Sequence, residues 1–257
     1  MPELSTCYLQ LMIITLILSL LNFYPVNPDP KPMNTAPVVS YDVLKLESPM
    51  KPDGNWNKAQ WQHSKEIEIT QRMGPVTSFT PTVRAKMMYD DQFVYIIFKV
   101  QDHYVRSIAN TINGRIWEDS CVEFFFAPDV QKPLAYFNLE INCGGFPLFH
   151  FKDPAVPGAP LPSVDDIKKI EIAHSMPSVV DPEITTPQTW TLEYRIPVEM
   201  LQRYASVTRP VKGAQWKANF YKCGDKTSNP HWLTWSVVQH PTPNFHLPEY
   251  FGTLNFK

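Results

Sequence analysis

The chain has 257 residues with a net charge of −2, and 44% of its residues are hydrophobic, so it can bury a sizeable core. Acidic and basic residues are interspersed, and no cluster of lysine and arginine indicates a surface for nucleic acid. Proline is abundant at 26 residues, whereas glycine is scarce at 9. Because proline breaks helices and is confined to loops, strand ends and sheet edges, this composition argues against a helical bundle and favours an all-β protein with long, proline-rich loops.

The chain begins with an apolar segment. Residues 8–24, YLQLMIITLILSLLNFY, have the character of a secretory signal or a membrane anchor, although no lysine or arginine precedes them. Two interpretations stay open. Either residues 1–24 direct a secreted or envelope-anchored protein, or translation starts at Met33 and the protein is cytoplasmic. We assign residues 25–51 to a proline-rich linker and the start of the domain, and residues 52–257 to one domain.

From residue 52 onward the patterns are those of strands. In TWTLEYRIP, alternation places Trp190 and Leu192 toward the core and Glu193 toward solvent. Helical turns are predicted only near residues 55–61 and 197–204. Strands are predicted at residues 66–70, 83–89, 93–100, 121–127, 135–142, 168–174, 189–197, 216–223, 232–237 and 251–256. So many short strands with turn-rich connections predict a two-sheet antiparallel β-sandwich of immunoglobulin-like architecture.

The cysteines and histidines show no metal-binding pattern. The four cysteines are far apart and form no C-x-x-C pair: Cys7, Cys121, Cys143 and Cys223. Cys121 and Cys143 lie in apolar runs typical of buried thiols, and a disulfide stays open. Three of the seven histidines lie in a proline-rich region without the spacing that zinc sites use: His231, His240 and His246.

The stretch GRIWEDSCVEFFFAP, residues 114–128, combines features that a sugar pocket needs. A sugar ring offers an apolar face of C–H groups and a rim of hydroxyls, so its site needs flat aromatic surfaces and converging polar groups. Trp117 stands where the loop meets the strand. Glu123 shares a face of that strand with Cys121, among aromatic residues, where an unpaired acid is costly to bury. We therefore expect Glu123 to have a partner, either a ligand hydroxyl or a basic side chain.

Structural explanations of the same residues stay open from local spacing alone. Trp117 could be a core residue. Glu118 and Asp119 could form a solvated loop edge. Glu123 could make an ion pair with Arg84 or Lys86 of a neighbouring strand.

The chain resembles, over roughly residues 52–257, the family 9 carbohydrate-binding modules and the wider DOMON-like sandwich group. The resemblance rests on five runs in order: PDGNWNKAQW, VRAKMMYDDQFVYIIFKVQD, WEDSCVEFFFAP, YFNLEINCGG and PEYFGTLNF. The segment ANFYKCGDKTSNPHWLTW, residues 218–235, is similar to stand-alone bacterial proteins of the family 9-like type. The resemblance implies a sandwich of two antiparallel sheets whose loops hold a sugar between two aromatic rings.

Position by position, the resemblance gives roles to particular residues. Trp117 matches the first aromatic residue of the clamp, and Glu123 matches a glutamate that hydrogen-bonds sugar hydroxyls. Phe245 matches the second aromatic residue, where the family has tryptophan, so the stacking area is reduced. Asn244 is expected to add a polar contact.

One charged contact of the family is expected to be missing. Its basic residue falls near Asn138 in this chain, where Glu140 and Asn142 are the available substitutes. The resemblance implies no cofactor, but some modules of the family carry structural calcium. Three turn acids are available as oxygen ligands for such an ion: Asp90, Asp91 and Asp102.

The predicted function is binding of a mono- or oligosaccharide, or of a glycan chain end, in polysaccharide recognition or catabolism. Two alternatives are kept. A glycoside hydrolase or its accessory would use acids near the slot, namely Glu118, Asp119, Glu123 and Glu140. A DOMON-type module would bind haem or a protein partner.

Overall fold

The computed structural model describes residues 39–257. The predicted signal-like segment and residues 25–38 of the proline-rich segment therefore lie outside the described residues. Within residues 39–257, no helix has the length and apolar character needed to cross a membrane.

The described chain is built almost entirely of strands, as predicted. The strands are β1 (Ser40–Lys45), β2 (Ile67–Glu68), β3 (Gln71–Met73), β4 (Thr82–Tyr89), β5 (Phe93–Asp102), β6 (Val105–Ser107), β7 (Cys121–Ala127), β8 (Tyr136–Asn142), β9 (Pro147–Lys152), β10 (Glu171–His174), β11 (Val180–Ile184), β12 (Gln188–Pro197), β13 (Gln215–Cys223), β14 (Trp232–Thr234) and β15 (Gly252–Phe256). The helical elements are short: α1 (Val164–Ile167), α2 (Val198–Leu201) and the 3-10 turns η1 (Ala59–His63), η2 (Ile116–Glu118) and η3 (Pro248–Tyr250).

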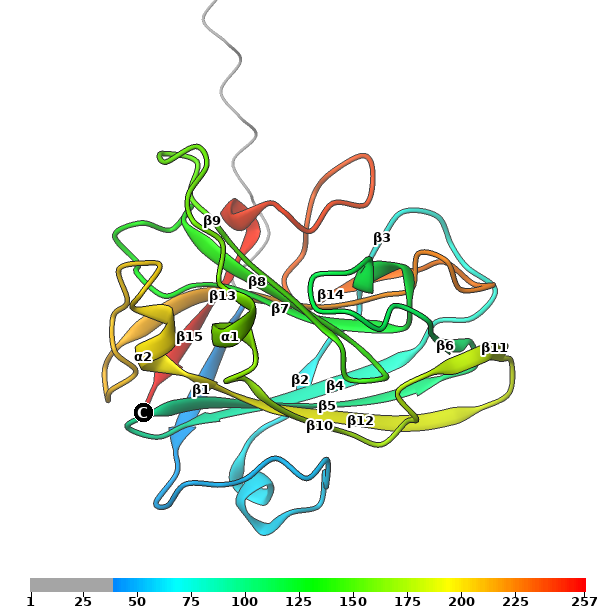
Figure 1. Ribbon diagram of the computed structural model, residues 1–257, viewed down its shortest axis with the longest axis horizontal. Coiled ribbons are helices and arrows are strands. Elements are labelled where there is room, and N and C mark those ends of the chain that lie inside the picture. The colour runs from blue at the N-terminus through cyan, green and yellow to red at the C-terminus, as the bar shows by residue number, and fades with distance from the viewer. Residues whose placement is uncertain (1–38) are drawn as a thin grey trace, which may run out of the picture. The chain divides into compact units, whose positions relative to one another are not determined.

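The strands form the two layers of a sandwich (Figure 1). One layer runs in the order β10-β12-β5-β4, with β2 beside β4. The other runs β15-β13-β7-β8-β9, with β14 and β3 continuing from β13. Neighbouring strands within each layer are antiparallel, and β6 pairs with β11 in a small separate sheet.

Strand β1 joins the two layers, and sequence analysis missed it. Residues 40–43 pair with β15, and residues 44–45 pair with β4, in parallel in both cases. The sheet is therefore not purely antiparallel. Because prolines dominate its surroundings, the sequence predicts this segment as linker and domain start. Its strand signal is short, with only Tyr41 and Val43 buried in alternation.

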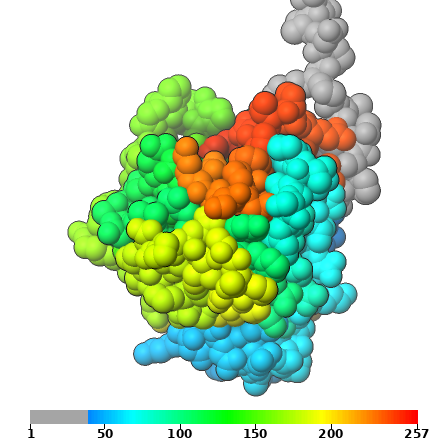
Figure 2. Space-filling view, turned by 90° about the vertical axis from the view of Figure 1, so that its right-hand side faces the viewer, coloured from blue at the N-terminus to red at the C-terminus, as the bar shows by residue number. Residues whose placement is uncertain are grey.

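The core between the layers is rich in aromatic side chains. Phe126 stacks on Phe124 at a centroid distance of 4.6 Å and on Trp216 at 5.5 Å, and Phe124 stacks on Phe220 at 4.9 Å. The even-numbered residues of β7 thus face the core. The odd-numbered residues point to the opposite face, which is also buried because loops cover it. Figure 2 shows the edge of this layer, where the segment with β14 (orange) lies against the segment with β3 (cyan), with which it pairs.

Glu193, which the sequence predicts to face solvent, is buried and accepts several hydrogen bonds. Glu193 on β12 is 0% exposed. Its carboxylate accepts hydrogen bonds from the backbone N–H groups of Asp53 and Gly54, both at 2.8 Å, from Lys58 Nζ at 3.0 Å and from Trp61 Nε1 at 3.0 Å. Alternation correctly predicts which face of β12 Glu193 lies on. It could not show that residues 53–61 fold over that face.

We predict that Glu193→Gln destabilises the protein by about 3 kcal/mol, because a neutral amide accepts more weakly from the buried donors and leaves Lys58 with only the exposed carboxylate of Asp53. Denaturation by urea, followed by tryptophan fluorescence, measures this change. The matched control is Glu171→Gln on neighbouring β10, whose carboxylate pairs with Arg195 but is 46% exposed, and it is expected to cost less than about 1 kcal/mol. An equal loss of stability in the two variants would contradict the role of Glu193 as the buried acceptor that holds residues 53–61.

Candidate functional site

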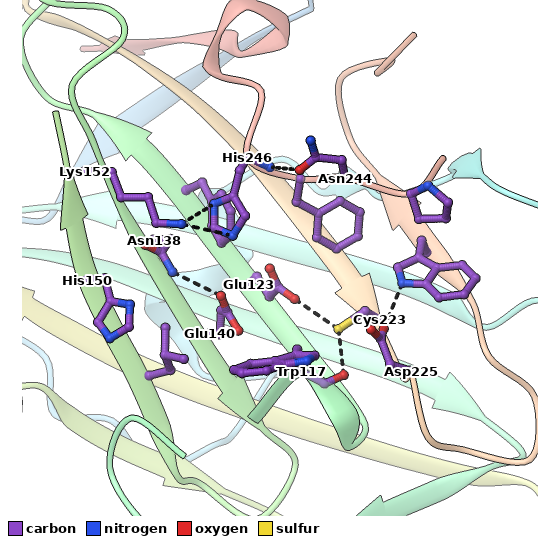
Figure 3. A pocket seen from close by; sticks show the side chains of 15 residues that line it. Trp117, Glu123, Asn138, Glu140, His150, Lys152, Cys223, Asp225, Asn244 and His246 are labelled. Atoms are coloured by element: carbon purple, nitrogen blue, oxygen red, sulfur yellow. Dashed lines mark hydrogen bonds between the residues drawn. The ribbon is translucent and has the colours of Figure 1, made fainter. Parts of the chain in front are cut away.

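The outer face of the second layer carries a pocket of about 370 Å³. Its floor comes from β7, β8, β9 and β13, and the loop before η3 lies over one side of it (Figure 3). The side chains that line it are those of Trp117, Glu123, Phe125, Asn138, Glu140, Leu148, His150, Lys152, Cys223, Asp225, Trp232, Pro243, Asn244, Phe245 and His246.

Two carboxyl groups stand side by side on the floor of the pocket. Glu123 on β7 and Glu140 on β8 are directly opposite in the strand register, and their exposed fractions are 2% and 5%. Glu123 Oε1 accepts a hydrogen bond from the thiol of Cys223 at 3.0 Å, and Glu140 Oε1 accepts one from the amide of Asn138 at 3.0 Å. Two neighbouring acceptor atoms, Glu140 Oε2 and Asn138 Oδ1, are buried without any hydrogen-bond partner within residues 39–257.

The expected ion pair of Glu123 with Arg84 or Lys86 is wrong. Both basic residues lie on β4 in the other layer, where Arg84 pairs with Glu66 and Lys86 donates to the carbonyl of Trp61. A strand pattern alone could not show which layer each strand joins.

Burial sets the protonation of the two floor carboxyls. Desolvation raises the pKa of Glu140 to about 7 and that of Glu123 well above its ordinary value, and repulsion from Glu140 adds to the shift of Glu123. Both shifts favour the neutral, protonated form, so the floor is less negative than two ordinary glutamates would make it. It offers both hydrogen-bond donors and acceptors to a ligand.

The opposite edge of the floor is basic. His150 on β9 is the register partner of Asn138, and Lys152 follows on the same face of β9. The ammonium of Lys152 lies 3.2 and 3.4 Å from the two ring nitrogens of His246, whose Nδ1 also meets the hydroxyl of Tyr136 at 2.9 Å. Burial, together with the charge of Lys152, lowers the pKa of His246 to about 4, so its ring is neutral at physiological pH. The cation that is missing at Asn138 is thus present on the next strand.

Aromatic side chains form the walls. Trp117, in η2, is partly buried, and Figure 3 shows it on one side of Glu123 and Glu140, with Asn244 and His246 on the other. The ring of Phe245 stacks on Tyr221 at a centroid distance of 4.2 Å, which fixes the ring in place. The predicted aromatic pair, Trp117 and Phe245, therefore lines a common pocket.

Asp119 anchors the turn that carries Trp117. It is 1% exposed and accepts hydrogen bonds from the backbone N–H groups of Ile108 and Ala109, at 2.9 and 2.8 Å, and from the guanidinium of Arg106 at 3.1 Å. The interpretation of Asp119 as a solvated loop edge is therefore wrong. Its acidic neighbour Glu118 is partly exposed and pairs with Arg115, so only that half of the interpretation agrees with the structure.

Of the six predicted binding residues, the structure brings five together and leaves one out. Asn142 is not among the residues that line the pocket. Its amide nitrogen donates to Asp119 Oδ2 at 3.0 Å and to the carbonyl of Ala109 at 2.8 Å, while its oxygen accepts from the N–H of Phe146 at 3.0 Å. Asn142 thus supports the turn of Trp117 instead of facing the pocket. The other five are pocket-lining residues: Trp117, Glu123, Glu140, Asn244 and Phe245.

Several pocket residues were not predicted. Trp232 on β14 donates from its indole N–H to Asp225 Oδ1 at 2.8 Å, and both residues line the pocket. They lie within the segment 218–235 that carries the family resemblance, but no local pattern marked them as ligand-binding. His150 and Lys152 were missed because β9 was not predicted. Its alternation of aromatic residues inward and polar residues outward is masked by the preceding Gly-Gly-Phe-Pro run.

The three acids considered for calcium do not form a common site. Asp90 accepts from the N–H groups of Gln92 and Phe93 and from the hydroxyl of Tyr95. Asp91 pairs with Lys45, and Asp102 is buried 3.4 Å from the ammonium of Lys222. Within residues 39–257 the three acids thus have separate partners and do not form one group of ligands.

Comparison with known proteins agrees with this geometry. The model of the family described as Carbohydrate-binding family 9 matches residues 55–256. Among solved structures, the chain is similar to a proposed carbohydrate-binding protein from Bacteroides uniformis, with 30% identity and a TM-score of 0.77 over 86% of this chain and 100% of that one.

Two further structures show the same fold at low identity. Both are family 9 carbohydrate-binding modules from Caldicellulosiruptor kristjanssonii, each 15% identical to this chain. The one in complex with cellotriose has a TM-score of 0.58 over 84% of this chain and 93% of that one. The one in complex with glucose has a TM-score of 0.59 over 85% and 96%. No curated protein sequence matches the chain. Since the family model spans nearly the whole described domain, this chain belongs to carbohydrate-binding family 9.

Proposed function

We propose that the chain binds a mono- or oligosaccharide in the pocket between Trp117 and Phe245. In this proposal the aromatic rings contact the apolar faces of the sugar, and the hydroxyls pair with Glu123, Glu140 and Asn244. The observation that carries the proposal is the pair of buried acceptor atoms on the floor, Glu140 Oε2 and Asn138 Oδ1, which have no donor within residues 39–257. Sugar hydroxyls are suitable donors for both.

The walls and floor suit a neutral, hydroxylated ring. A volume of about 370 Å³ lies at the lower end of the range of small-molecule sites, which favours one or two sugar units over a long chain segment. An apolar ligand would leave the floor acceptors unpaired, at a cost of about 1–3 kcal/mol each. The carboxyl groups and the amide of Asn138 carry donor and acceptor atoms, so the floor can both donate to and accept from hydroxyls.

The ligands of the solved relatives support a glucose-type sugar, since the Caldicellulosiruptor modules are in complex with cellotriose and with glucose. The apolar segment at residues 1–24 supports a secreted or envelope-anchored protein that acts in polysaccharide recognition. Outside the cell, a protein that binds the end of a glycan chain would attach to polysaccharides or to their fragments.

The alternative of glycan hydrolysis has less support. Hydrolysis by two carboxyls requires them to have contrasting environments, one held protonated and the other ionised. Burial raises the pKa of both Glu123 and Glu140. Release of reducing sugar from a labelled oligosaccharide by the pure protein, lost in Glu123→Gln, would nevertheless establish the enzyme and overturn a purely binding role.

We predict that Trp117→Ala weakens binding of cello-oligosaccharides by about 30-fold, equivalent to about 2 kcal/mol, because it removes one aromatic wall. Isothermal titration calorimetry measures the change. The matched control is Phe93→Ala, which removes a partly exposed aromatic ring from β5 in the other layer and is expected to leave affinity unchanged. Unaltered binding by a folded Trp117→Ala protein would remove the site assignment.

The floor carboxyls also predict a pH dependence of stability. The pKa of Glu140 is about 7 in the folded protein against an ordinary value of 4.5, so the folded state holds a proton that the unfolded state releases between these values. Stability contributed by this group is therefore complete below about pH 4.5 and declines as pH rises toward 7.

Glu140→Gln removes this decline, because glutamine has no proton to lose and its oxygen can still accept from Asn138. We expect the variant to match the wild type near pH 4.5 and to be more stable by up to about 3 kcal/mol near pH 8, as measured by urea denaturation at each pH. The exposed Glu68→Gln on β2 is the control, and it should follow the wild-type curve. A Glu140→Gln protein with the wild-type pH dependence would contradict the assigned protonation.

A further inference from the structure

Below the sugar pocket lies a cluster of three metal-ligating side chains. Cys121, Glu123 and Cys223 are all buried, and one ligand atom of each lies within 4.8 Å of the other two. It is the one group of three or more cysteine, histidine or acidic side chains with this proximity in residues 39–257. We propose that these three side chains form a binding site for one thiophilic divalent cation of the zinc type, on the floor of the pocket.

The strand register creates the cluster. Cys121 on β7 and Cys223 on β13 are directly opposite on neighbouring antiparallel strands, so their side chains share a face. Glu123 follows two residues after Cys121 and points to the same side. Its Oε1 already lies 3.0 Å from the sulfur of Cys223. The three ligands thus come from two paired strands and need no loop to order them.

The spacing suits a tetrahedral ion. With metal–sulfur bonds of about 2.3 Å and metal–oxygen bonds of about 2.1 Å, the ligand atoms of such a site are roughly 3.5–3.8 Å apart. The three ligand atoms are at most 4.8 Å apart. Side-chain rotations that move each atom by about 1 Å or less therefore bring them to the distances of a tetrahedral site. Soft thiolates with one carboxylate favour zinc and related ions over calcium or magnesium.

Binding of the ion requires its three ligands to lose their protons. When the ion binds, the two S–H bonds and the carboxyl O–H bond break and three protons leave to solvent. The divalent ion then takes the three electron pairs and leaves one net negative charge.

Access to the cluster is from the pocket. Cys223 and Glu123 line the pocket, whereas Cys121 lies behind them and is 0% exposed. Three protein ligands leave the fourth position open toward the pocket, as in sites where a zinc ion also holds water or a ligand oxygen. An ion bound here would withdraw Glu123 from direct contact with sugar. Because the two proposed sites share Glu123, sugar binding is measured without metal and metal binding without sugar, so that each proposal is tested by itself.

The test uses the purified full chain in its reduced form, with Zn²⁺ as the ligand in calorimetry and Co²⁺ as a spectroscopic probe. The wild type is expected to bind one ion per chain and to show the visible and charge-transfer bands of a Co²⁺–thiolate complex. Cys121→Ser and Cys223→Ser should each weaken binding at least about 100-fold and remove the thiolate bands, and Glu123→Gln should weaken binding by at least about 10-fold.

Cys143→Ser is the matched control, because Cys143 is also a buried free thiol and the variant has the same number of thiols as Cys223→Ser. It is expected to bind the ion like the wild type. Far-UV circular dichroism confirms that each variant is folded. Should a ligand variant fail to fold, X-ray absorption at the zinc edge of the wild-type complex, with a shell of two sulfur ligands expected, gives the same answer.

Three results would overturn the proposal. They are no stoichiometric binding by reduced wild type, equal loss of binding in Cys143→Ser, and a Cys121–Cys223 disulfide that forms in place of the metal complex under reducing conditions. Loss of sugar binding in Trp117→Ala with intact metal binding would leave this proposal standing.

Discussion

The structure depends on strand β7 being buried on both faces. Its even-numbered residues, Phe124 and Phe126 among them, pack into the aromatic core between the layers. Its odd-numbered residues face the other way, where Glu123 and Phe125 line the pocket. Because side chains alternate along a strand, the same seven residues hold the sandwich together and present the site. A register slip of one residue would place the carboxyl of Glu123 in the core and Phe124 in the pocket.

Two buried carboxylates that lie outside the core hold loops in place. Asp119 gathers backbone N–H groups and a guanidinium around the turn of Trp117, and Glu193 does the same for residues 53–61. Each of these carboxylates accepts hydrogen bonds from several protein donors that take the place of water. These bonds compensate for the cost of burying the charge. The pocket carboxyls differ from these two. Glu140 has one amide donor and an oxygen left without a partner within residues 39–257. Glu140 thus keeps an acceptor atom free for a ligand at the pocket, whereas Asp119 and Glu193 are engaged by the loops that they hold.

The sequence allowed prediction of the fold class, most of the long strands and a pocket that contains Trp117, Glu123 and Phe245. Alternation and strand propensity act locally, so they suffice for β7, β8 and β12. They do not report what covers a strand face, and so the prediction placed Glu193 in solvent. Short strands such as β1 and β9 were missed because neighbouring prolines and glycines hide their pattern. Lys152, Asp225 and Trp232 reach the pocket only through tertiary pairing, which one sequence does not reveal.

The central claim is that a sugar sits on the outer face of β7 and β8, against Trp117. A crystal structure of the protein soaked or grown with cellotriose tests it most directly. The account predicts a sugar ring between the indole of Trp117 and the ring of Phe245, with hydroxyls within hydrogen-bonding distance of Glu140 Oε2 and Asn138 Oδ1. Cellotriose bound on another surface, with this pocket holding only water, would contradict it.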